Sequence, residues 1–381
     1  MKMQQIAELV NSVTSEALGE ENLLQEDLSN VVSVGDAIQN VMGLDNYVKK
    51  LCDRIGRTIF VDRVYSGEGG ILSAIYRDGF EFGSIIQKVN TILPEAMENE
   101  DWQLENLQSY DYSIFYQPNV SVKYFNDKTT WSIRLSFTEE QVKSAFNGPT
   151  ELSSFIAMLH NSINNSMTVK EEELARRALN NLASHVIATN DGVTYVKLLT
   201  LYNATLPDSA TPLDADEFMR TPEAVKFAIA YFYRIIDRLG TMSTLFNLEH
   251  TPKFTSKDRL SFIVLSDFET NIRAFVDSDT WHYEKIALPE HKTVTYWQGS
   301  GDDYAFSNVS KIDVKNSYGD TVNVSNIVAI AFDRDAVAVC NTKRKTDVAY
   351  NPAASFYTEF HKFETQMFTD SQENMVVFAL N

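Results

Sequence analysis

Residues 150–189, TELSSFIAMLHNSINNSMTVKEEELARRALNNLASHVIAT, decide the fold. Their apolar residues lie three or four positions apart on both sides of a polar joint at 164–166: Leu152, Phe155, Ile156, Leu159, Ile163, Leu174, Ala178, Leu179, Leu182 and Val186. This spacing predicts a long helical pattern with one apolar face. At 1.5 Å per residue it would reach about 60 Å, which exceeds the width of an ordinary domain. The polar joint is the place where we expect a break or bend.

Local signals mark where this helical region starts and stops. Thr138 and Gln141 have the spacing of a capping box and predict a short helix that ends at Asn147-Gly148-Pro149. Asn190-Asp191-Gly192 has the composition of a helix terminator. The chain therefore changes abruptly at Thr138 from the pattern that precedes it.

That preceding pattern, residues 57–137, predicts a β-rich excursion. Strand-like runs rich in β-branched and aromatic residues lie at 57–65, 71–80, 112–125 and 129–137, separated by a glycine turn at 66–70 and an acidic connector at 92–107. An isolated two-stranded ribbon is marginal in water. We therefore expect the excursion to dock on another copy of the chain, in a symmetric and closed assembly.

The N-terminal 50 residues predict acidic helices with a narrow apolar stripe. A helix of this kind needs a partner to cover its apolar face. The sequence leaves open whether that partner is its own domain or a neighbouring subunit.

The second half of the chain mixes helix and strand signals. Residues 194–203 predict a strand or the lead into one, and residues 206–217 predict a loop. Residues 222–239 predict a helix that starts at Thr221-Pro222 and stops at Gly240. A buried strand is predicted at 259–266, a helix capped by Ser266 at 267–278, and further strands and turns at 293–301 and 320–331. Two buried strands follow at 327–332 and 336–340, joined at Asp333-Arg334-Asp335, and a last strand lies at 375–380.

Bulk composition excludes several classes of protein. The 381 residues carry 52 Asp and Glu against 33 Lys and Arg, a net charge of −19, which disfavours nucleic-acid and anionic-membrane binding. No apolar run approaches the roughly 20 residues that span a bilayer. The N-terminus MKMQQIAELV has no secretory core, so we expect the chain to stay in the cytosol where it is made. Cys52 and Cys340 suit neither a disulfide framework nor a zinc site.

Catalytic signatures are missing from the sequence. It has no P-loop, no Rossmann spacing, no nucleophile elbow and no HExxH motif, and its six histidines are scattered. Pairs of acids such as Asp333 and Asp335 do not have the spacing of a calcium loop. We expect no catalytic residue, no cofactor and no metal, although an active site built from distant residues would leave no local signature.

The order of elements resembles the major capsid proteins of tailed double-stranded-DNA bacteriophages, the Hong Kong 97-type fold, and is most similar to the small podovirus branch. The segments that carry this resemblance are Leu51–Gly56, Glu151–Ile156 with Asn164-Asn165-Ser166, Phe332–Ala336, Tyr350-Asn351-Pro352 and Glu373–Phe378. The sequence departs from the family in two respects: no cross-linking lysine and asparagine pair can be assigned, and the N-terminal helix is short for an internal scaffold domain.

The resemblance implies an α+β fold with an N-terminal arm (1–56), an extended β-hairpin loop or E-loop with its flanking strands (57–137), a peripheral domain with the spine helix (138–192), an axial domain (193–330) and C-terminal peripheral strands (331–381). It implies a structural shell protein that forms pentamers and hexamers of an icosahedral head, located in the virion and assembled in the host cytoplasm. The implied partners are other copies of itself, scaffolding and portal proteins, and double-stranded DNA enclosed without specific binding, with no membrane.

Two sets of residues are predicted to contact neighbouring subunits. Phe60, Val61, Tyr65 and Ile71 of the E-loop would dock over a neighbour, and the basic patch Lys343-Arg344-Lys345 would meet acidic arms more readily than DNA. Deleting residues 66–100 should then leave a soluble subunit that makes no shells. The alternatives are an encapsulin-like cargo compartment, a cytosolic α/β enzyme with a non-local site, and a tail or portal component.

Overall fold

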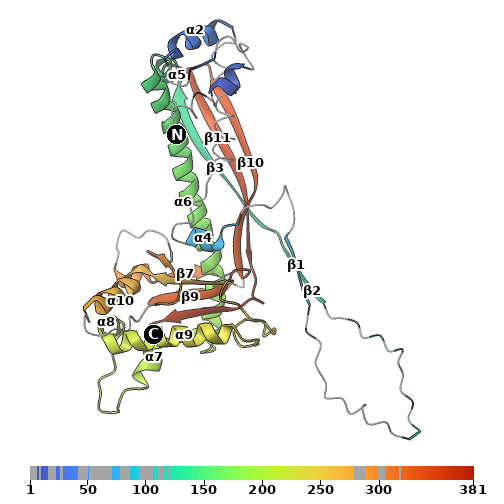
Figure 1. The fold of residues 1–381 in the computed structure, drawn as a ribbon, viewed down its shortest axis with the longest axis vertical. Coiled ribbons are helices and arrows are strands. Elements are labelled where there is room, and N and C mark those ends of the chain that lie inside the picture. Colours follow the sequence, from blue (N-terminus) through green and yellow to red (C-terminus); the bar gives the residue numbers. More distant parts are fainter. Residues whose placement is uncertain are drawn as a thin grey trace.

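The computed structural model of the protein describes residues 120–278, 288–298, 305–316 and 319–381, together with 10–15, 23–25, 29–41, 71–77 and 86–91 and the single positions 7, 50, 93, 106, 107, 109, 113, 115 and 117. Figure 1 shows its three main features: one long helix, two sheets packed along that helix, and a β-ribbon that leads away from the body.

The long helix α6 spans Pro149–Thr189, 41 residues without interruption. Its first half, from Leu152 to Met167, packs into one apolar core, and its second half, from Leu174 to Ile187, packs into another. The polar joint does not break the helix. Asn165 and Ser166 are exposed to solvent, while Ile163 and Met167 on either side are buried, so the polar side chains lie on the outer face.

A three-stranded antiparallel sheet lies along the first half of α6, in the order β10 (Val337–Asn351), β11 (Phe356–Thr369) and β3 (Asp127–Thr138). One face carries Trp131 stacked on Phe363, with ring centroids 4.1 Å apart, and Phe137 stacked on Tyr357. These side chains join the core formed with α6, α2 (Val31–Val41) and residues 10–13. The described N-terminal residues therefore pack on their own subunit.

A five-stranded mixed sheet crosses the second half of α6, in the order β4 (Tyr195–Lys197), β12 (Met375–Ala379), β9 (Ile327–Asp333), β5 (Leu260–Leu265) and β6 (Lys292–Val294). Its other face is covered by α9 (Pro222–Leu239) and α10 (Ser266–Ser278). Phe232, Phe262 and Phe378 meet edge to face at the centre of that second core. This sheet is therefore buried on both sides.

The remaining elements are short: α4 (Ile71–Ile75), β1 (Ile86–Thr91), β2 (Val120–Phe125), α5 (Glu139–Ala145), α7 (Leu198–Asn203), α8 (Ala215–Arg220), α11 (Phe306–Val309), β7 (Ile312–Lys315) and β8 (Thr321–Val324). The pairs β1–β2 and β7–β8 are antiparallel two-stranded ribbons. Among the described residues, no helix is long and apolar enough to cross a bilayer.

Several sequence predictions are confirmed. Thr138 and Gln141 form the predicted capping box at the start of α5, with the Gln141 backbone N–H donating to Thr138 Oγ1 over 3.2 Å and the Thr138 N–H donating to Gln141 Oε1 over 2.8 Å. Asn190 ends α6 in the left-handed conformation, with φ 48°. Pro222 starts α9, and β5, β9 and β12 lie where apolar runs predicted them.

Other predictions are wrong for identifiable reasons. Residues 71–75 form helix α4 instead of a strand, because Ile71, Ala74 and Ile75 recur at helical spacing and are buried against α6. The predicted loop 206–217 ends inside α8, which Asp214 and Glu217 start with a second capping box.

The C-terminal strands divide between the two sheets, although the sequence grouped 331–381 together. The predicted boundary at 330/331 falls inside β9. β10 and β11 belong to the three-stranded sheet, whereas β12 returns to the five-stranded sheet between β4 and β9. Asp333–Ala336 and the turn Asp370–Asn374 therefore each connect a strand of one sheet directly to a strand of the other.

Candidate functional site

The β1–β2 ribbon leaves the body at the point where the two sheets meet (Figure 1). β2 and β3 are separated only by Asn126, so one strand pairs with β1 along the ribbon and then with β11 inside the body. At this change of partner, Gln366 Nε2 donates to the Phe125 carbonyl oxygen over 2.7 Å. The ribbon is thus a continuation of the three-stranded sheet.

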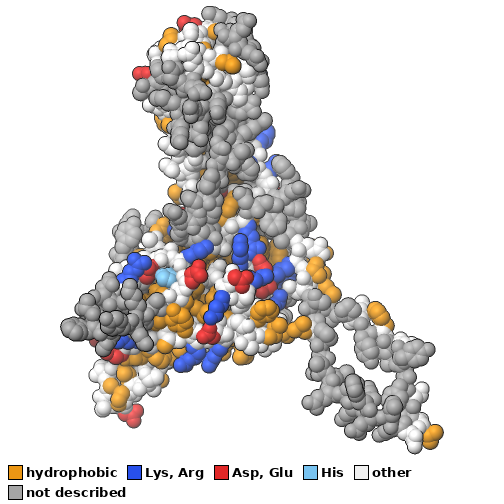
Figure 2. All heavy atoms as spheres, viewed as in Figure 1, with side chains coloured by type: hydrophobic (Ala, Val, Ile, Leu, Met, Phe, Trp, Pro, Cys, Tyr) orange, Lys and Arg blue, Asp and Glu red, His pale blue; other side chains and the backbone are white. Residues whose placement is uncertain are grey.

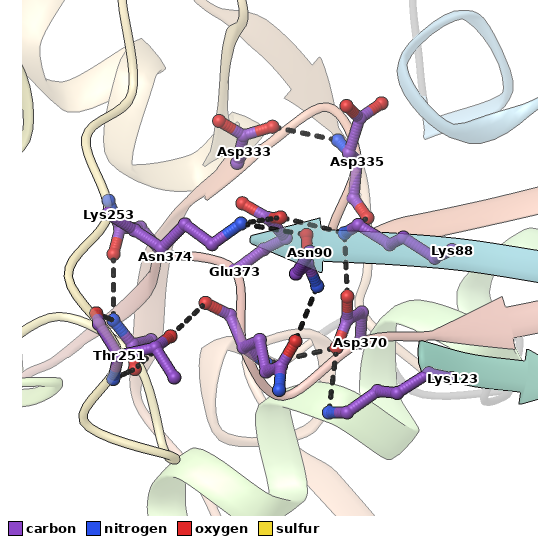
Figure 3. Close-up of polar contacts among 12 residues, drawn as sticks. Lys88, Asn90, Lys123, Thr251, Lys253, Asp333, Asp335, Asp370, Glu373 and Asn374 are labelled. Atoms are coloured by element: carbon purple, nitrogen blue, oxygen red, sulfur yellow. Dashed lines mark hydrogen bonds and ion pairs between the residues drawn. The ribbon is translucent and has the colours of Figure 1, made fainter. Parts of the chain in front are cut away.

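Ion pairs fasten the root of the ribbon to the body (Figure 3). Lys88 Nζ of β1 lies 2.6 Å from Asp370 Oδ2 and 2.7 Å from Glu373 Oε1. Lys123 Nζ of β2 lies 3.1 Å from Asp370 Oδ1, on the other side of the same carboxylate. Lys253, from the segment between α9 and β5, lies 3.1 Å from Glu373 Oε1. We call these five residues the ribbon clamp.

Neighbouring polar groups extend the ribbon clamp to three parts of the chain. Lys253 Nζ donates to Asn90 Oδ1 over 3.1 Å, and Asn90 Nδ2 donates to Gln372 Oε1. Glu249 accepts from Lys123, from Ser371 and, over 2.9 Å, from Gln372 Nε2. The turn between β11 and β12, the 240–255 segment and both ribbon strands are therefore held in one network.

The electrostatics of the ribbon clamp keep its charges in place. Burial raises the pKa of Asp370, but the positive charges of Lys88 and Lys123, the hydrogen bond from Lys88 and the hydrogen bond from the Gln372 backbone lower it by more. The net pKa is below the ordinary value. Burial likewise lowers the pKa of Lys88, while Asp370 and Glu373 raise it, and the net pKa is above the ordinary value. Both groups are thus charged at neutral pH.

The opposite face of the ribbon is apolar and exposed. Lys88, Asn90 and Lys123 point toward the body, so by strand alternation their neighbours point away from it. Val89 pairs with Val122 on this outward face, flanked by Val120 and Tyr124, and these four side chains are between 41% and 66% exposed. In the described part of the ribbon, one face forms ion pairs with the body, and the other exposes these four apolar or aromatic side chains beside Gln87.

Figure 2 shows the surroundings of the root in space-filling form. Lysine, arginine, aspartate and glutamate side chains are interleaved across the body beside the departing ribbon. Arg77 forms a further ion pair with Asp335 at 2.7 Å, which joins the segment after α4 to the connection between β9 and β10. Oppositely charged side chains are therefore mixed on the surface around the ribbon.

The predicted E-loop contacts can be placed only in part. Phe60, Val61 and Tyr65 lie outside the described residues. Ile71 is 3% exposed and packs in the core beside α6, so it cannot dock over a neighbour. The prediction for Ile71 is wrong because that residue belongs to the helix α4 instead of an exposed strand.

The predicted basic patch is split by strand alternation. Lys343, Arg344 and Lys345 lie on β10, where successive side chains point to opposite faces of the sheet. Lys343 and Lys345 are exposed on the outer face. The Arg344 guanidinium lies over the Phe363 ring, 5.2 Å from its centroid, on the face toward α6. Only two of the three residues can therefore meet a partner from outside.

Sequence reasoning missed the ribbon clamp. Its members come from four separate segments, and none of them forms a local motif. No local signal in the sequence distinguishes Lys88, Lys123 and Lys253 from the other cations of the chain. Among the described residues, no group of three or more His, Cys, Asp and Glu residues is arranged to hold a metal ion. The ribbon clamp joins separate segments of the same chain.

Comparison with known proteins gives a consistent result. The model of the family described as Phi29-like phage major capsid protein matches residues 10–379. Among solved structures, a chain in the capsid structure of Staphylococcus phage Andhra is similar, with a TM-score of 0.50 and 10% identity over 84% of each chain. A chain from Mycobacterium phage Che8 has a TM-score of 0.44 and 10% identity, covering 82% of this chain and 91% of that one. No curated protein matches the chain.

Proposed function

The chain belongs to the Phi29-like phage major capsid protein family, and from that premise we propose that its β1–β2 ribbon joins neighbouring subunits of the shell. The protein is a structural component of a phage capsid and is located in the virion. Its fold is similar to that of a chain in the capsid structure of Staphylococcus phage Andhra, in agreement with the predicted Hong Kong 97-type fold. Family membership does not favour the predicted alternatives of a cargo compartment or a cytosolic enzyme.

One observation carries the role of the ribbon, which is the contrast between its two faces. The ribbon clamp satisfies the inward face, so that face needs no second partner. The outward row of Val89, Val120, Val122 and Tyr124 has no cover within the described residues. Burying such a row on another copy removes apolar surface from water, at roughly 25 cal/mol for each Å². Many equivalent contacts in one shell would then add by avidity.

The finer features of assembly belong to the same proposal. We infer that subunits associate as pentamers and hexamers that close into an icosahedral head, with scaffolding and portal proteins as partners. The net charge of −19 supports enclosure of DNA without specific binding, because the subunit as a whole repels a polyanion. We propose no enzymatic activity, in keeping with a structural family.

A test must disturb the ribbon without disturbing the core. Deletion of 66–100 does not meet this requirement, because it removes the buried residues of α4 together with β1. Val89→Asp combined with Val122→Asp changes only the exposed row. We expect this chain to fold with unchanged circular dichroism and to form no closed shells when sedimented and viewed by electron microscopy.

The control applies the same substitution elsewhere. Val169→Asp lies on the exposed side of α6 and is 68% exposed in the parent chain. It should assemble as the parent does. Normal shells from the ribbon variant, or equal loss from both variants, would show that the ribbon has no special role in assembly.

A further inference from the structure

The outer face of the three-stranded sheet is uncovered and positively charged. Strand alternation places five cations and two carboxylates on this face, a net charge of +3 in a chain of −19: Lys128, Arg134, Lys343, Lys345, Lys362, Asp347 and Glu364. Arg134, Lys343, Lys345 and Lys362 are exposed. The other face of the same sheet is packed against α6 and the N-terminal residues. We call the outer surface the basic sheet face.

The positive charge of the basic sheet face is only partly compensated within the subunit. Lys345 and Lys362 share Asp347, each at 2.9 Å, and Lys128 lies 3.1 Å from Glu364. Among the described residues, neither Lys343 nor Arg134 forms an ion pair. Arg134 instead lies over the Phe360 ring, 5.8 Å from its centroid.

The cations of the basic sheet face surround a hollow. Its volume is about 410 Å³, and its lining includes Arg134, Lys343, Lys345, Lys362 and the ring of Phe360. Cationic side chains around an aromatic ring suit a partner that carries both carboxylates and apolar or aromatic groups. A polyanion without apolar groups would pair with the cations but would make no contact with the ring of Phe360.

The chain itself contains a segment of that composition. Residues 92–119, between β1 and β2, hold six acidic residues and no lysine or arginine: Glu95, Glu98, Glu100, Asp101, Glu105 and Asp111. Aromatic residues are interleaved with them, among them Trp102, Tyr110 and Phe115. Both strands that hold this segment lead away from the body (Figure 1).

The acidic N-terminal run, residues 16–27, is the competing partner, and the described residues within it and beside it argue against it. Leu24, inside that run, is buried, and its backbone N–H donates to Asn11 Oδ1 over 2.6 Å while its carbonyl accepts from Asn11 Nδ2 over 2.8 Å. The residues on both sides of the run, Val10–Val13 and Val31–Val34, are packed on the opposite face of the subunit's own sheet. The described residues on both sides of the N-terminal run are therefore packed on their own subunit, whereas the two described strands that flank 92–119 lead away from the body (Figure 1).

We propose that the basic sheet face of one subunit receives the acidic segment 92–119 of a second copy of this chain. This proposal rests on the function proposed for the ribbon, and it names the surface that the ribbon's far end contacts. Carboxylates would pair with Lys343, Lys345 and Lys362, and an aromatic side chain would occupy the hollow beside Phe360. Because the contact is largely electrostatic and exposed, it weakens as salt shortens the Debye length from about 10 Å at 0.1 M to about 3 Å at 1 M.

Charge reversal on each side tests the proposal in the full-length chain. Lys343→Glu, Lys345→Glu and Lys362→Glu together are expected to lower the yield of closed shells at least tenfold, as are Glu98→Lys, Glu100→Lys and Asp101→Lys together. The chain with both sets should recover at least half of the parent yield, because the charges are again complementary. Circular dichroism and unfolding midpoints check that each variant folds.

The matched control moves the second reversal to the competing segment. Glu20→Lys, Glu21→Lys and Glu26→Lys, added to the reversed sheet face, should restore nothing. Rescue by that set would assign the face to the N-terminal run and overturn the proposal. If the variant with the reversed sheet face forms shells at normal yield and only their DNA content is reduced, the proposal is overturned and nucleic acid is the partner of the basic sheet face.

A covalent trap gives an independent readout if charge reversal harms folding. In a Cys52→Ser chain, Lys345→Cys and Glu100→Cys subunits are mixed under mild oxidation, with the buried Cys340 left in place. We expect disulfide-linked dimers in the mixture and none from either variant by itself, and their absence from the mixture would sink the proposal. If the Val89 and Val122 variant makes no shells but the reversed sheet face does, this inference alone fails.

Discussion

The two sheets of this subunit differ in what covers them. Every residue of β9 and β12 in the five-stranded sheet is buried, because α6 packs on one face and α9 with α10 on the other. In the three-stranded sheet, β3 alternates between exposed and half-buried residues along most of its length. Continuous apolar strands build an interior, and alternating strands present a face. The first sheet thus forms part of the interior of the subunit, and the second leaves one face open to solvent.

The largest expected effect comes from breaking the five-stranded sheet. Phe378→Ala removes a fully buried ring that contacts Phe232 and Phe262. We expect the free energy of unfolding to fall by about 3–5 kcal/mol, since a large core side chain is replaced by a cavity. Denaturant unfolding followed by circular dichroism measures this loss. Ile133→Ala, at a half-buried position of β3, should cost less than half as much, and equal losses would contradict the contrast between the sheets.

A smaller effect is expected where the two sheets are joined. Asp370→Asn removes the charge that holds Lys88 and Lys123, whose side chains are 19% and 24% exposed. Breaking a fully buried pair costs about 3–5 kcal/mol, and the partial exposure of the lysines reduces our expectation to about 2 kcal/mol. Hydrogen exchange of the β1 amides should report the loosened root directly, and unchanged exchange would show that the ribbon does not depend on the clamp.

The pH dependence of the parent chain sharpens the same point. Because the folded pKa of Asp370 is lowered, its contribution is complete above the unfolded value of about 3.9 and is lost as pH falls through the folded value. Because the folded pKa of Lys88 is raised, its contribution is complete below about 10.4 and is lost as pH rises through the folded value. Hydrogen exchange of the β1 amides should therefore show no additional opening of the ribbon root between about pH 5 and 9. Below that range we expect the root to open in the parent chain, and Asp370→Asn should remove this acid-induced change.

The smallest effect on stability is expected on the open face of the three-stranded sheet. Lys345→Ala removes one exposed partner of Asp347, which keeps Lys362. The unfolding midpoint should change by no more than the equivalent of about 0.5 kcal/mol, as is usual for surface positions. A loss above 1 kcal/mol would mean that this face contributes to the fold and is not reserved for a neighbour.

The sequence predicted most of the fold where periodicity and caps agreed. The apolar stripe of 150–189, the capping box at Thr138 and the buried runs of β5, β9 and β12 all correspond to observed elements. It failed at Ile71–Ile75, because a five-residue apolar run fits a strand and a helix turn equally well. The sequence also could not show that β12 belongs to a different sheet from β10 and β11, because the choice of sheet depends on contacts between residues far apart in the chain.

The candidate site was harder to predict than the fold. Ion pairs such as Lys88 with Asp370 join residues 282 positions apart, and no local pattern marks them. The run Lys343-Arg344-Lys345 was visible as charge, but its composition does not show that Arg344 faces the opposite side. Strand register adds Arg134 and Lys362 to the same surface, and register appears only once the sheet is paired.

The position of β12 has a consequence for the order of events during synthesis. Residues 375–379 lie between β4 and β9, pairing with Tyr195–Lys197 on one side and with 327–332 on the other. A nascent polypeptide that has reached residue 370 therefore contains β4 and β9 but lacks β12, the strand that pairs with both of them. Translation must pass residue 379 before the interior can close, so a partly made subunit still on the ribosome lacks a rigid body with which to join a growing shell.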